Sequence, residues 1–328
     1  MNIKITTFNC ENLFGRYRIL DKPPTTAIKN LETLLQIPEV VVLEAGRSGK
    51  IKPAAIAQTQ RTTTGKAILG AAPDILAVQE VENLSTLRIF NHKYLGDAFD
   101  RVLLVDGNDA RGIDVGLLLK KGLAADVTAI QTHADEALGG GFLPKSTRLD
   151  TTNVGKAIFS RDCLEVDLRV GNRTLTFLVN HFKAQDNKPN TPTRRLNQAK
   201  RVLALAKAAR SAGKHPIVIG DLNIDTAQAD YDQSLQPLFS ATTPVVDPFA
   251  NTAAADRWTH YYSSKKSVSR LDYILLDQTM ANKVVGREIF RRGLSPKCTQ
   301  FTGPRLPSMN GNNLEASDHC PTSIVLQL

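Results

Sequence analysis

The chain has 328 residues, of which 42% are hydrophobic and 22% are charged; this composition is typical of a folded globular protein and excludes disorder of the whole chain. Its 41 Lys and Arg residues outnumber its 32 Asp and Glu residues, which gives a formal net charge of +9. A charge of this size favours polyanionic partners such as nucleic acid or acidic lipid surfaces, although a basic surface without such a partner has the same charge.

The cysteines and the hydropathy pattern favour a cytoplasmic protein. The four cysteines are too few and too dispersed for a disulfide framework or a Cys-x-x-Cys zinc site. The N-terminal residues alternate in the manner of a strand and lack the apolar segment of a signal peptide. No apolar run approaches the ~20 residues of a membrane-spanning helix, so the sequence predicts no stable membrane insertion. Export without a cleaved signal stays open as an alternative.

The first part of the chain predicts a strand, an irregular segment, a helix and a second strand. Alternation of apolar and polar residues predicts a strand at Ile3–Phe8, and residues 17–50 are interpreted as an irregular insertion. Apolar residues at helical spacing predict a helix over Ala54–Leu69, which Pro73 ends. The apolar run Ile75–Val78 then predicts a buried strand.

Short segments rich in Val, Ile and Leu recur along the rest of the chain and predict further strands. They are Arg101–Val105, Val115–Lys120, Ala157–Phe159, Leu164–Val170, Leu175–Asn180, Ile217–Ile219, Tyr273–Leu276 and Thr322–Leu326. Between two of them, Arg194–Ala212 has the pattern of an amphipathic helix that Gly213 ends. This mixture predicts an α/β protein with mixed sheets. Without repeats or linkers, we expect one domain over 1–328, with irregular insertions near 17–50 and 122–153.

Polar and ionisable residues stand at the ends of these predicted strands. They are Asn9, Glu80, His181, Asp221 and Asn223, which follow strands, and Asp272 and Asp318–His319, which precede strands. Side chains at strand ends converge at the edge of a sheet, where α/β proteins form ligand sites. Taken singly, Gly220–Asn223 could be a turn and Ser317–His319 a helix cap. The coincidence of all these residues favours one functional site.

Seven motifs also occur in order: FNCEN (8–12), PDILAVQEVEN (73–83), RGIDVGLLL (111–119), VNHFKAQ (179–185), IVIGDLNID (217–225), RLDYILL (270–276) and SDHCP (317–321). Together they resemble the endonuclease/exonuclease/phosphatase superfamily, whose members include deoxyribonuclease I-like enzymes, and most closely its bacterial nuclease-like branch. The resemblance runs from residue 3 to residue 328 and is missing chiefly over 17–50 and 122–153. It is specific, because all seven motifs keep their order.

The resemblance implies a fold and a metal site. The fold is a four-layer α/β/β/α sandwich, with two mixed β-sheets packed face to face and helices outside. The family's metal-binding Glu matches Glu80, with Asn9 beside it, and Glu11 falls where some members carry a metal-side carboxylate. Asp318 is assigned to this metal group, although it also matches a residue near the scissile phosphate. Mg²⁺ is the expected cofactor, with Mn²⁺ or Ca²⁺ as alternatives, because hard ions take oxygen ligands.

The other matched residues are expected around the scissile phosphate. His319, oriented by Asp272, would accept a proton from the attacking water or hold a proton against the phosphate, and Asp221 is the competing general base. His181 would donate to the phosphate or to the leaving oxygen, and Asn223 would give a neutral hydrogen bond. The resemblance thus implies a divalent-metal-dependent phosphodiesterase.

A few residues carry weaker expectations. Asp114 matches the carboxylate that orients the first His in deoxyribonuclease-like members, or it pairs locally with Arg111. Arg111 contacts phosphate or forms a surface ion pair, and Lys183 contacts phosphate if its strand continues, or else is solvated. Trp258 and Tyr261 are core residues or stack on a base. No role is assigned to the remaining histidines, His92, His133, His215 and His260.

Three functions are compatible with this sequence. A nuclease that hydrolyses DNA or RNA phosphodiester bonds is the leading hypothesis, because it unites the motifs with the net charge of +9. The alternative is a hydrolase of another phosphate ester, such as an inositol phosphate or a phospholipid headgroup, because one fold serves many substrates. A non-catalytic binding module is disfavoured, since the site motifs are complete. DNA versus RNA, endo- versus exonucleolytic cleavage and protein partners stay open.

Overall fold

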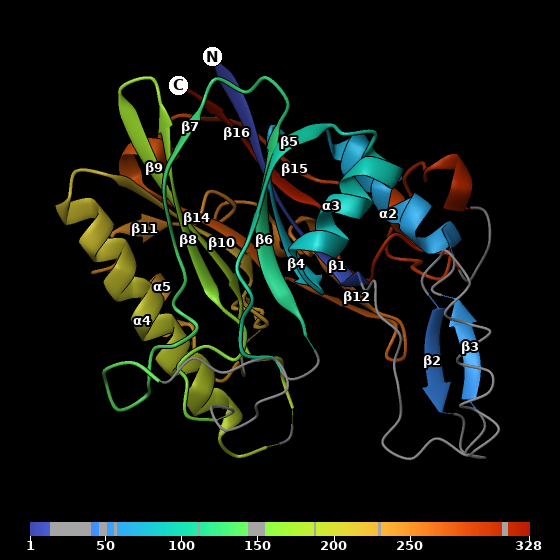
Figure 1. Cartoon of the computed structure of the whole chain (residues 1–328), viewed down its shortest axis with the longest axis horizontal. Helices are drawn as coiled ribbons and strands as arrows, with labels where there is room; N and C mark the ends of the chain where they lie inside the picture. The colour runs from blue at the N-terminus through green and yellow to red at the C-terminus, as the bar shows by residue number, and fades with distance from the viewer. Residues whose placement is uncertain are drawn as a thin grey trace.

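Two mixed six-stranded β-sheets form the centre of the molecule (Figure 1). The structure is a computed structural model and describes residues 1–13, 41–45, 51–55, 58–109, 112–143, 155–186, 188–228, 231–309 and 314–328. Two small hairpins accompany the large sheets. They pair β2 (Val41–Ala45) with β3 (Ile51–Ala55) and β12 (His260–Tyr262) with β13 (Ser267–Ser269).

The first sheet has the strand order β15–β16–β1–β4–β6–β5. Its strands are β1 (Asn2–Leu13), β4 (Ile75–Val81), β5 (Phe99–Leu104), β6 (Asp114–Lys120), β15 (Val284–Ile289) and β16 (Thr322–Gln327). The central strands β1 and β4 run parallel, with Asn9 opposite Gln79. Both are almost continuously buried, as expected for strands that are covered on two faces. Their C-terminal ends therefore meet at one edge of the sheet.

The second sheet has the strand order β11–β14–β10–β9–β8–β7. Its strands are β7 (Asp126–Gln131), β8 (Cys163–Val170), β9 (Arg173–His181), β10 (His215–Asp221), β11 (Val245–Val246) and β14 (Asp272–Asp277). Strands β9 and β10 run parallel, whereas β14 pairs with β10 in the antiparallel direction. The C-terminal ends of β9 and β10 thus lie beside the start of β14.

Three apolar clusters hold the layers together. Ile5 and Ile75 of the first sheet and Phe177 and Ile219 of the second belong to one buried cluster, so the two sheets pack face to face. A second cluster joins α2 (Gln58–Ala71) and α3 (Leu84–Leu95) to the first sheet, and a third joins α4 (Thr191–Ser211) and α5 (Gln236–Phe239) to the second. Each fully buried Leu, Ile or Phe side chain contributes about 1.5–3 kcal/mol. The result is the predicted α/β/β/α sandwich (Figure 1).

The helices are short apart from α4. They are α2 (Gln58–Ala71), α3 (Leu84–Leu95), α4 (Thr191–Ser211), α5 (Gln236–Phe239) and α6 (Gln278–Ala281), with 3₁₀ turns at η1 (Ala254–Asp256), η2 (Arg291–Gly293) and η3 (Pro307–Met309). The sequence does not predict α3, although it has local signals. The Asn83 side chain accepts from the Thr86 N–H, and Gly96 ends the helix with a left-handed φ of 60°. Within the described ranges, no helix combines the length and apolar character needed to cross a bilayer.

Most predicted strands are confirmed, and the differences have local causes. The helix predicted at Ala54–Leu69 begins later because Ile51–Ala55 forms β3. The segment Ala157–Phe159 is not a strand, and Ala157 makes only an isolated bridge. The irregular insertion predicted near 122–153 contains β7, an edge strand whose mostly exposed side chains lack apolar alternation. Apart from β2, the insertion predicted at 17–50 lies outside the described residues.

Candidate active site

Three of the predicted site residues lie in a row across adjacent strands of the second sheet. His181 is the register partner of Asp221 in the parallel pair β9–β10, and Asp221 is the partner of Asp272 in the antiparallel pair β10–β14. Gly220 allows this arrangement, because its φ is +135° and a Cβ there would lie 1.9 Å from the Asn180 carbonyl oxygen. The sequence Gly-Asp therefore ends β10 with a carboxylate at the sheet edge.

Asn9 and Glu80, which belong to the first sheet, lie beside these residues of the second sheet. Asn9 Nδ2 donates to Glu80 Oε1 at 3.3 Å and to Asp221 Oδ2 at 3.1 Å, and so links the two sheets. Asn9 Oδ1 accepts from the Glu11 N–H at 3.0 Å. The role of Asn9 as a metal ligand stays a prediction. Glu80 has a left-handed φ of 61°, a strained conformation that costs on the order of 1–3 kcal/mol and clusters at functional sites.

The segment before β16 closes the site. Ser317 Oγ donates to the Asn9 carbonyl oxygen at 2.7 Å and accepts from the His319 N–H at 3.0 Å. His319 Nδ1 lies 2.8 Å from Asp272 Oδ2, so the structure brings this predicted pair into contact. Thr259 Oγ1 donates to the same Asp272 oxygen at 2.6 Å. The imidazole is thereby held by a carboxylate that is itself fixed.

Burial and charge set the protonation of Asp221 and His319. Their nearest side-chain atoms, His319 Nε2 and Asp221 Oδ2, are 3.8 Å apart. Burial raises the pKa of Asp221 to about 7; the charge of His319 opposes this rise and that of Asp272 adds to it. Burial lowers the pKa of His319, but Asp272 and Asp221 outweigh it and the pKa lies well above its usual value. Near neutral pH, His319 therefore carries a proton and Asp221 is poised to accept one.

His181 faces two carboxylates from different sheets. Its Nε2 lies 3.5 Å from Asp221 Oδ2 and 3.8 Å from Glu80 Oε1. The carboxylate of Asp114 accepts from the Gly107 N–H at 2.8 Å. The orientation of His181 by Asp114 stays a prediction from the sequence.

Asn223 extends the site beyond β10. Its N–H donates to Asp221 Oδ1 at 2.9 Å, and its Nδ2 donates to the Phe182 carbonyl oxygen at 3.1 Å. Its backbone φ is 59°, a left-handed conformation that Asn tolerates better than most residues. Positive φ thus occurs at Asn223, which contacts the Asp221 carboxylate directly, and at Glu80, which shares the Asn9 amide with Asp221.

The carboxylates at the first-sheet side fit a hard divalent cation. The Asn12 N–H donates to Glu80 Oε2 at 3.0 Å, and the Asp318 N–H donates to Glu11 Oε2 at 3.2 Å. Burial, followed by the negative charges of Asp318 and Glu315, raises the pKa of Glu11 to about 8. Half-buried carboxylates that repel one another in this way form the oxygen-rich, negatively charged environment that Mg²⁺ or a similar ion takes.

A family comparison identifies the fold and chemistry. Residues 7–319 match the model of the Endonuclease/Exonuclease/phosphatase family. The chain belongs to this family. It is a phosphoester hydrolase, and enzymes of the family generally depend on a divalent metal ion. Among curated proteins, none matches the chain.

Solved structures of the family share the fold at low sequence identity. Truncated TDP2 from Caenorhabditis elegans is 14% identical with a TM-score of 0.57, and the match covers 100% of this chain and 98% of that one. The human Nocturnin catalytic domain with bound sulfate is 14% identical with a TM-score of 0.60, over 99% and 94%. A mannosyl-6-phosphatase from Bacteroides thetaiotaomicron is 12% identical with a TM-score of 0.58, over 99% and 100%.

The candidate site opens into a cleft of about 1010 Å³. Six predicted residues line it, namely Glu80, His181, Asp221, Asn223, Asp318 and His319. Strand β9 ends at His181, so the strand on which the expectation for Lys183 depended does not continue. The Lys183 ammonium instead lies 2.9 Å from Asp186 Oδ2. Arg111 lies outside the described residues.

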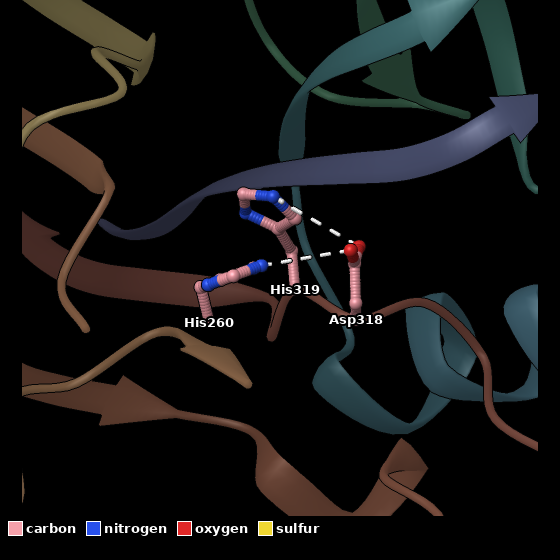
Figure 2. Close-up of side chains that lie close together, drawn as sticks. All are labelled: His260, Asp318 and His319. Carbon is pink, nitrogen blue, oxygen red and sulfur yellow. Dashed lines mark ion pairs between the residues drawn. The ribbon is translucent and has the colours of Figure 1, made fainter. Parts of the chain in front are cut away.

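The sequence does not predict the contribution of β12 to this cleft. His260 and Tyr262 line it, and His260 forms a backbone bridge with His319. The two imidazole rings are 4.7 Å apart, and both are directed toward Asp318 (Figure 2). Trp258 and Tyr261, for which core and base-stacking positions were both open, are buried core residues. A three-residue strand shows too little periodicity to be recognised, and its contact with residues 318–320 is not local.

Proposed function

We propose that this protein is a divalent-metal-dependent phosphodiesterase that cleaves nucleic acid. The observation that carries the proposal is the juxtaposition of Asp221 with His319 in the lining of the cleft, with the pKa of Asp221 raised to about 7 and that of His319 well above its usual value. An acid and a base with different protonation states, side by side, are what ester hydrolysis by water requires.

Each side chain has a distinct task in this proposal. Asp221 accepts the proton of the attacking water, because its pKa near neutrality suits a general base. Protonated His319, oriented by Asp272, donates a hydrogen bond to a phosphate oxygen and offsets its negative charge. His181 and the amide of Asn223 complete the donors around the phosphate.

Glu80, Glu11 and Asp318 are the residues that would hold the metal ion. When bound there, a divalent ion supplies Lewis-acid polarisation of a phosphate oxygen. The Asn12 N–H holds the Glu80 carboxylate, the Asp318 N–H holds that of Glu11, and Asn9 Nδ2 also donates to Glu80. Mg²⁺ is the proposed ion, because the set consists of hard oxygen ligands.

The margin of the cleft supports a nucleic-acid substrate. Tyr262 lines the cleft with 46% of its surface exposed, and the Lys265 ammonium lies 5.3 Å from the centre of its ring. An exposed aromatic ring with an adjacent cation can stack on a base and contact a neighbouring phosphate. The net charge of +9 adds long-range attraction for a polyanion. A solved TDP2 structure from D. rerio with the same fold contains a single-stranded DNA product.

Cleavage assays with purified protein test this proposal. Supercoiled plasmid, single-stranded DNA and single-stranded RNA are incubated with Mg²⁺, Mn²⁺ or Ca²⁺, and products are resolved on gels. We expect cleavage that EDTA abolishes and that Glu80→Gln reduces by about 10²–10³-fold. The absence of cleavage of every polymer by folded wild-type protein would refute the nucleic-acid substrate.

A small phosphate ester is the second candidate substrate. It is favoured by the mannosyl-6-phosphatase from Bacteroides thetaiotaomicron, whose structure matches as well as those of TDP2 and Nocturnin. Phosphate release from sugar phosphates, inositol phosphates and phospholipid headgroups, measured beside the polymers, separates the two candidates. Turnover of one small ester at a kcat/KM above that of every polymer would favour this second candidate.

A further inference from the structure

A second group of metal-ligand side chains lies beside the carboxylates around Glu80. In the part of the chain that the structure describes, His260, Asp318 and His319 place their ligand atoms within 4.8 Å of one another (Figure 2). His260 Nε2 is 3.5 Å from Asp318 Oδ2, and His319 Nε2 is 3.9 Å from Asp318 Oδ1. Two imidazole nitrogens therefore approach one carboxylate, each nearest to a different oxygen atom.

Both imidazoles are held by their other ring nitrogen. His319 Nδ1 lies 2.8 Å from Asp272 Oδ2, and His260 Nδ1 lies 3.2 Å from Ser269 Oγ. A histidine that binds a metal usually donates its second ring N–H to a carboxylate or another acceptor, which fixes the ring and leaves the opposite nitrogen as the ligand. The Nε2 atoms of His260 and His319 are both oriented in this way toward Asp318.

The separations suit a small transition-metal ion. Bonds of about 2.0–2.1 Å in a tetrahedral site place neighbouring ligand atoms about 3.3 Å apart. The observed separations are 3.5 Å to Asp318 Oδ2, 3.9 Å to Asp318 Oδ1, and up to 4.8 Å within the whole group, so side-chain rotations would have to bring the three ligand atoms onto one ion. The Asp318 side chain is 35% exposed, which leaves an approach for the ion and a position for water.

This group shares Asp318 with the proposed site around Glu80, but its other two ligands are imidazoles instead of carboxylates. Carboxylates favour Mg²⁺, whereas imidazole nitrogens favour ions such as Zn²⁺. We propose that His260, Asp318 and His319 form a second site for a transition-metal ion such as Zn²⁺, and that occupation of this site inhibits hydrolysis. His319 would then release its Nε2 proton to solvent and donate the freed lone pair to the ion, so it could no longer hold a proton against the phosphate.

Direct metal binding tests the site without any substrate. Full-length protein freed of metal with a chelator is titrated with Co²⁺, whose visible absorption reports nitrogen ligation, and the Co²⁺ is then displaced with Zn²⁺. We expect one strong site in the wild type. His260→Gln should weaken Co²⁺ binding by at least about tenfold, since loss even of a residue that only orients a ligand costs 10–100-fold. The matched control His92→Gln, which removes an exposed histidine, should bind as the wild type does.

Inhibition by Zn²⁺ in excess Mg²⁺ provides the second readout, with each variant compared with its own zinc-free rate. The half-inhibitory Zn²⁺ concentration should rise about tenfold in His260→Gln, and by less in Ser269→Ala. Thermal unfolding of each variant verifies folding. Equal Co²⁺ affinity in wild type and His260→Gln, or equal inhibition by Zn²⁺, would overturn the proposal. Because Co²⁺ binding needs no substrate, failure of the proposed nuclease activity would not be mistaken for failure of this site.

Discussion

Two buried histidines in this protein each contact a carboxylate through Nδ1 but have very different surroundings. His319 in the cleft lies 2.8 Å from Asp272 through Nδ1, and His133, which does not line the cleft, lies 2.8 Å from Glu136 through Nδ1. The Nε2 atom of His133 is also hydrogen-bonded, to Glu165 Oε2 at 2.9 Å. The Nε2 atom of His319, by contrast, is 3.8 Å from Asp221 Oδ2, and His319 lines the cleft.

The charged groups around the two histidines also differ. Arg201 binds both oxygens of Glu136 at 2.6 and 2.5 Å, so the His133 cluster pairs its charges within the protein. Around His319, the neighbouring carboxylate of Asp221 is buried and has a raised pKa, and left-handed backbone occurs at Glu80 and Asn223. A histidine–carboxylate pair thus stabilises the fold when both ring nitrogens are bonded and suits chemistry when one of them faces a cleft.

The largest effect should come from Asp221→Asn, which keeps the shape of the side chain and removes the proposed base. We expect kcat to fall by about 10³-fold, within the range typical of general-base removal. Because burial raises the pKa of Asp221 to about 7, its ionised form is disfavoured in the folded state. The protonated Asp221 carboxyl stabilises the fold below pH 3.8, and this stabilisation is lost as the pH rises toward 7. At neutral pH the Asp221→Asn variant should therefore not have a lower melting temperature than the wild type. Activity within tenfold of wild type would remove Asp221 from the mechanism.

A smaller loss is expected for Asp272→Asn, because Asp272 is a positioning residue that acts through His319. The raised pKa of His319, which Asp272 supports against the effect of burial, should fall. We expect kcat to decrease by about 10²-fold and the alkaline limb of the pH–rate profile to move to lower pH. A merely structural role would reduce the folded fraction and leave the shape of that profile unchanged.

At the second cluster, His133→Gln should affect stability and leave kcat unchanged. The substitution breaks hydrogen bonds to Glu136 and Glu165 in a buried environment, which costs about 2–4 kcal/mol of the free energy of unfolding. Urea denaturation measures the loss, and the exposed substitution His92→Gln serves as the matched control. A decrease in kcat of the folded variant would show that the two clusters are not separate.

The smallest expected effect is the pH dependence of the stability that His133 contributes. Although burial lowers the pKa of His133, Glu136 and Glu165 raise it to about 9, above its ordinary value of 6.5. The stabilisation is therefore complete below pH 6.5 and is lost as pH rises through about 9. The difference in unfolding free energy between wild type and His133→Gln should shrink by on the order of 2 kcal/mol between these pH values. A difference that stays constant would contradict the charged state of His133.

Much of the geometry of the candidate site could be predicted because its residues follow strands with clear apolar patterns. His181 and Asp221 end parallel neighbours, so their proximity follows from pairing alone. The contribution of His260 could not be predicted, because it depends on a bridge between a three-residue strand and the segment before β16. The contact of Thr259 with Asp272 could not be predicted for the same reason. Edge strand β7 was not predicted, because its mostly exposed side chains do not alternate between apolar and polar.

The most direct test of the central claim compares the two histidines in one assay. Hydrolysis of a nucleic-acid oligomer in Mg²⁺ is measured for His319→Gln and His133→Gln, with each rate corrected for the folded fraction. The difference in their surroundings predicts that His319→Gln loses about 10²–10³-fold in kcat while His133→Gln keeps the wild-type value. Equal rates in the two variants would contradict the assignment of the chemistry to the cleft.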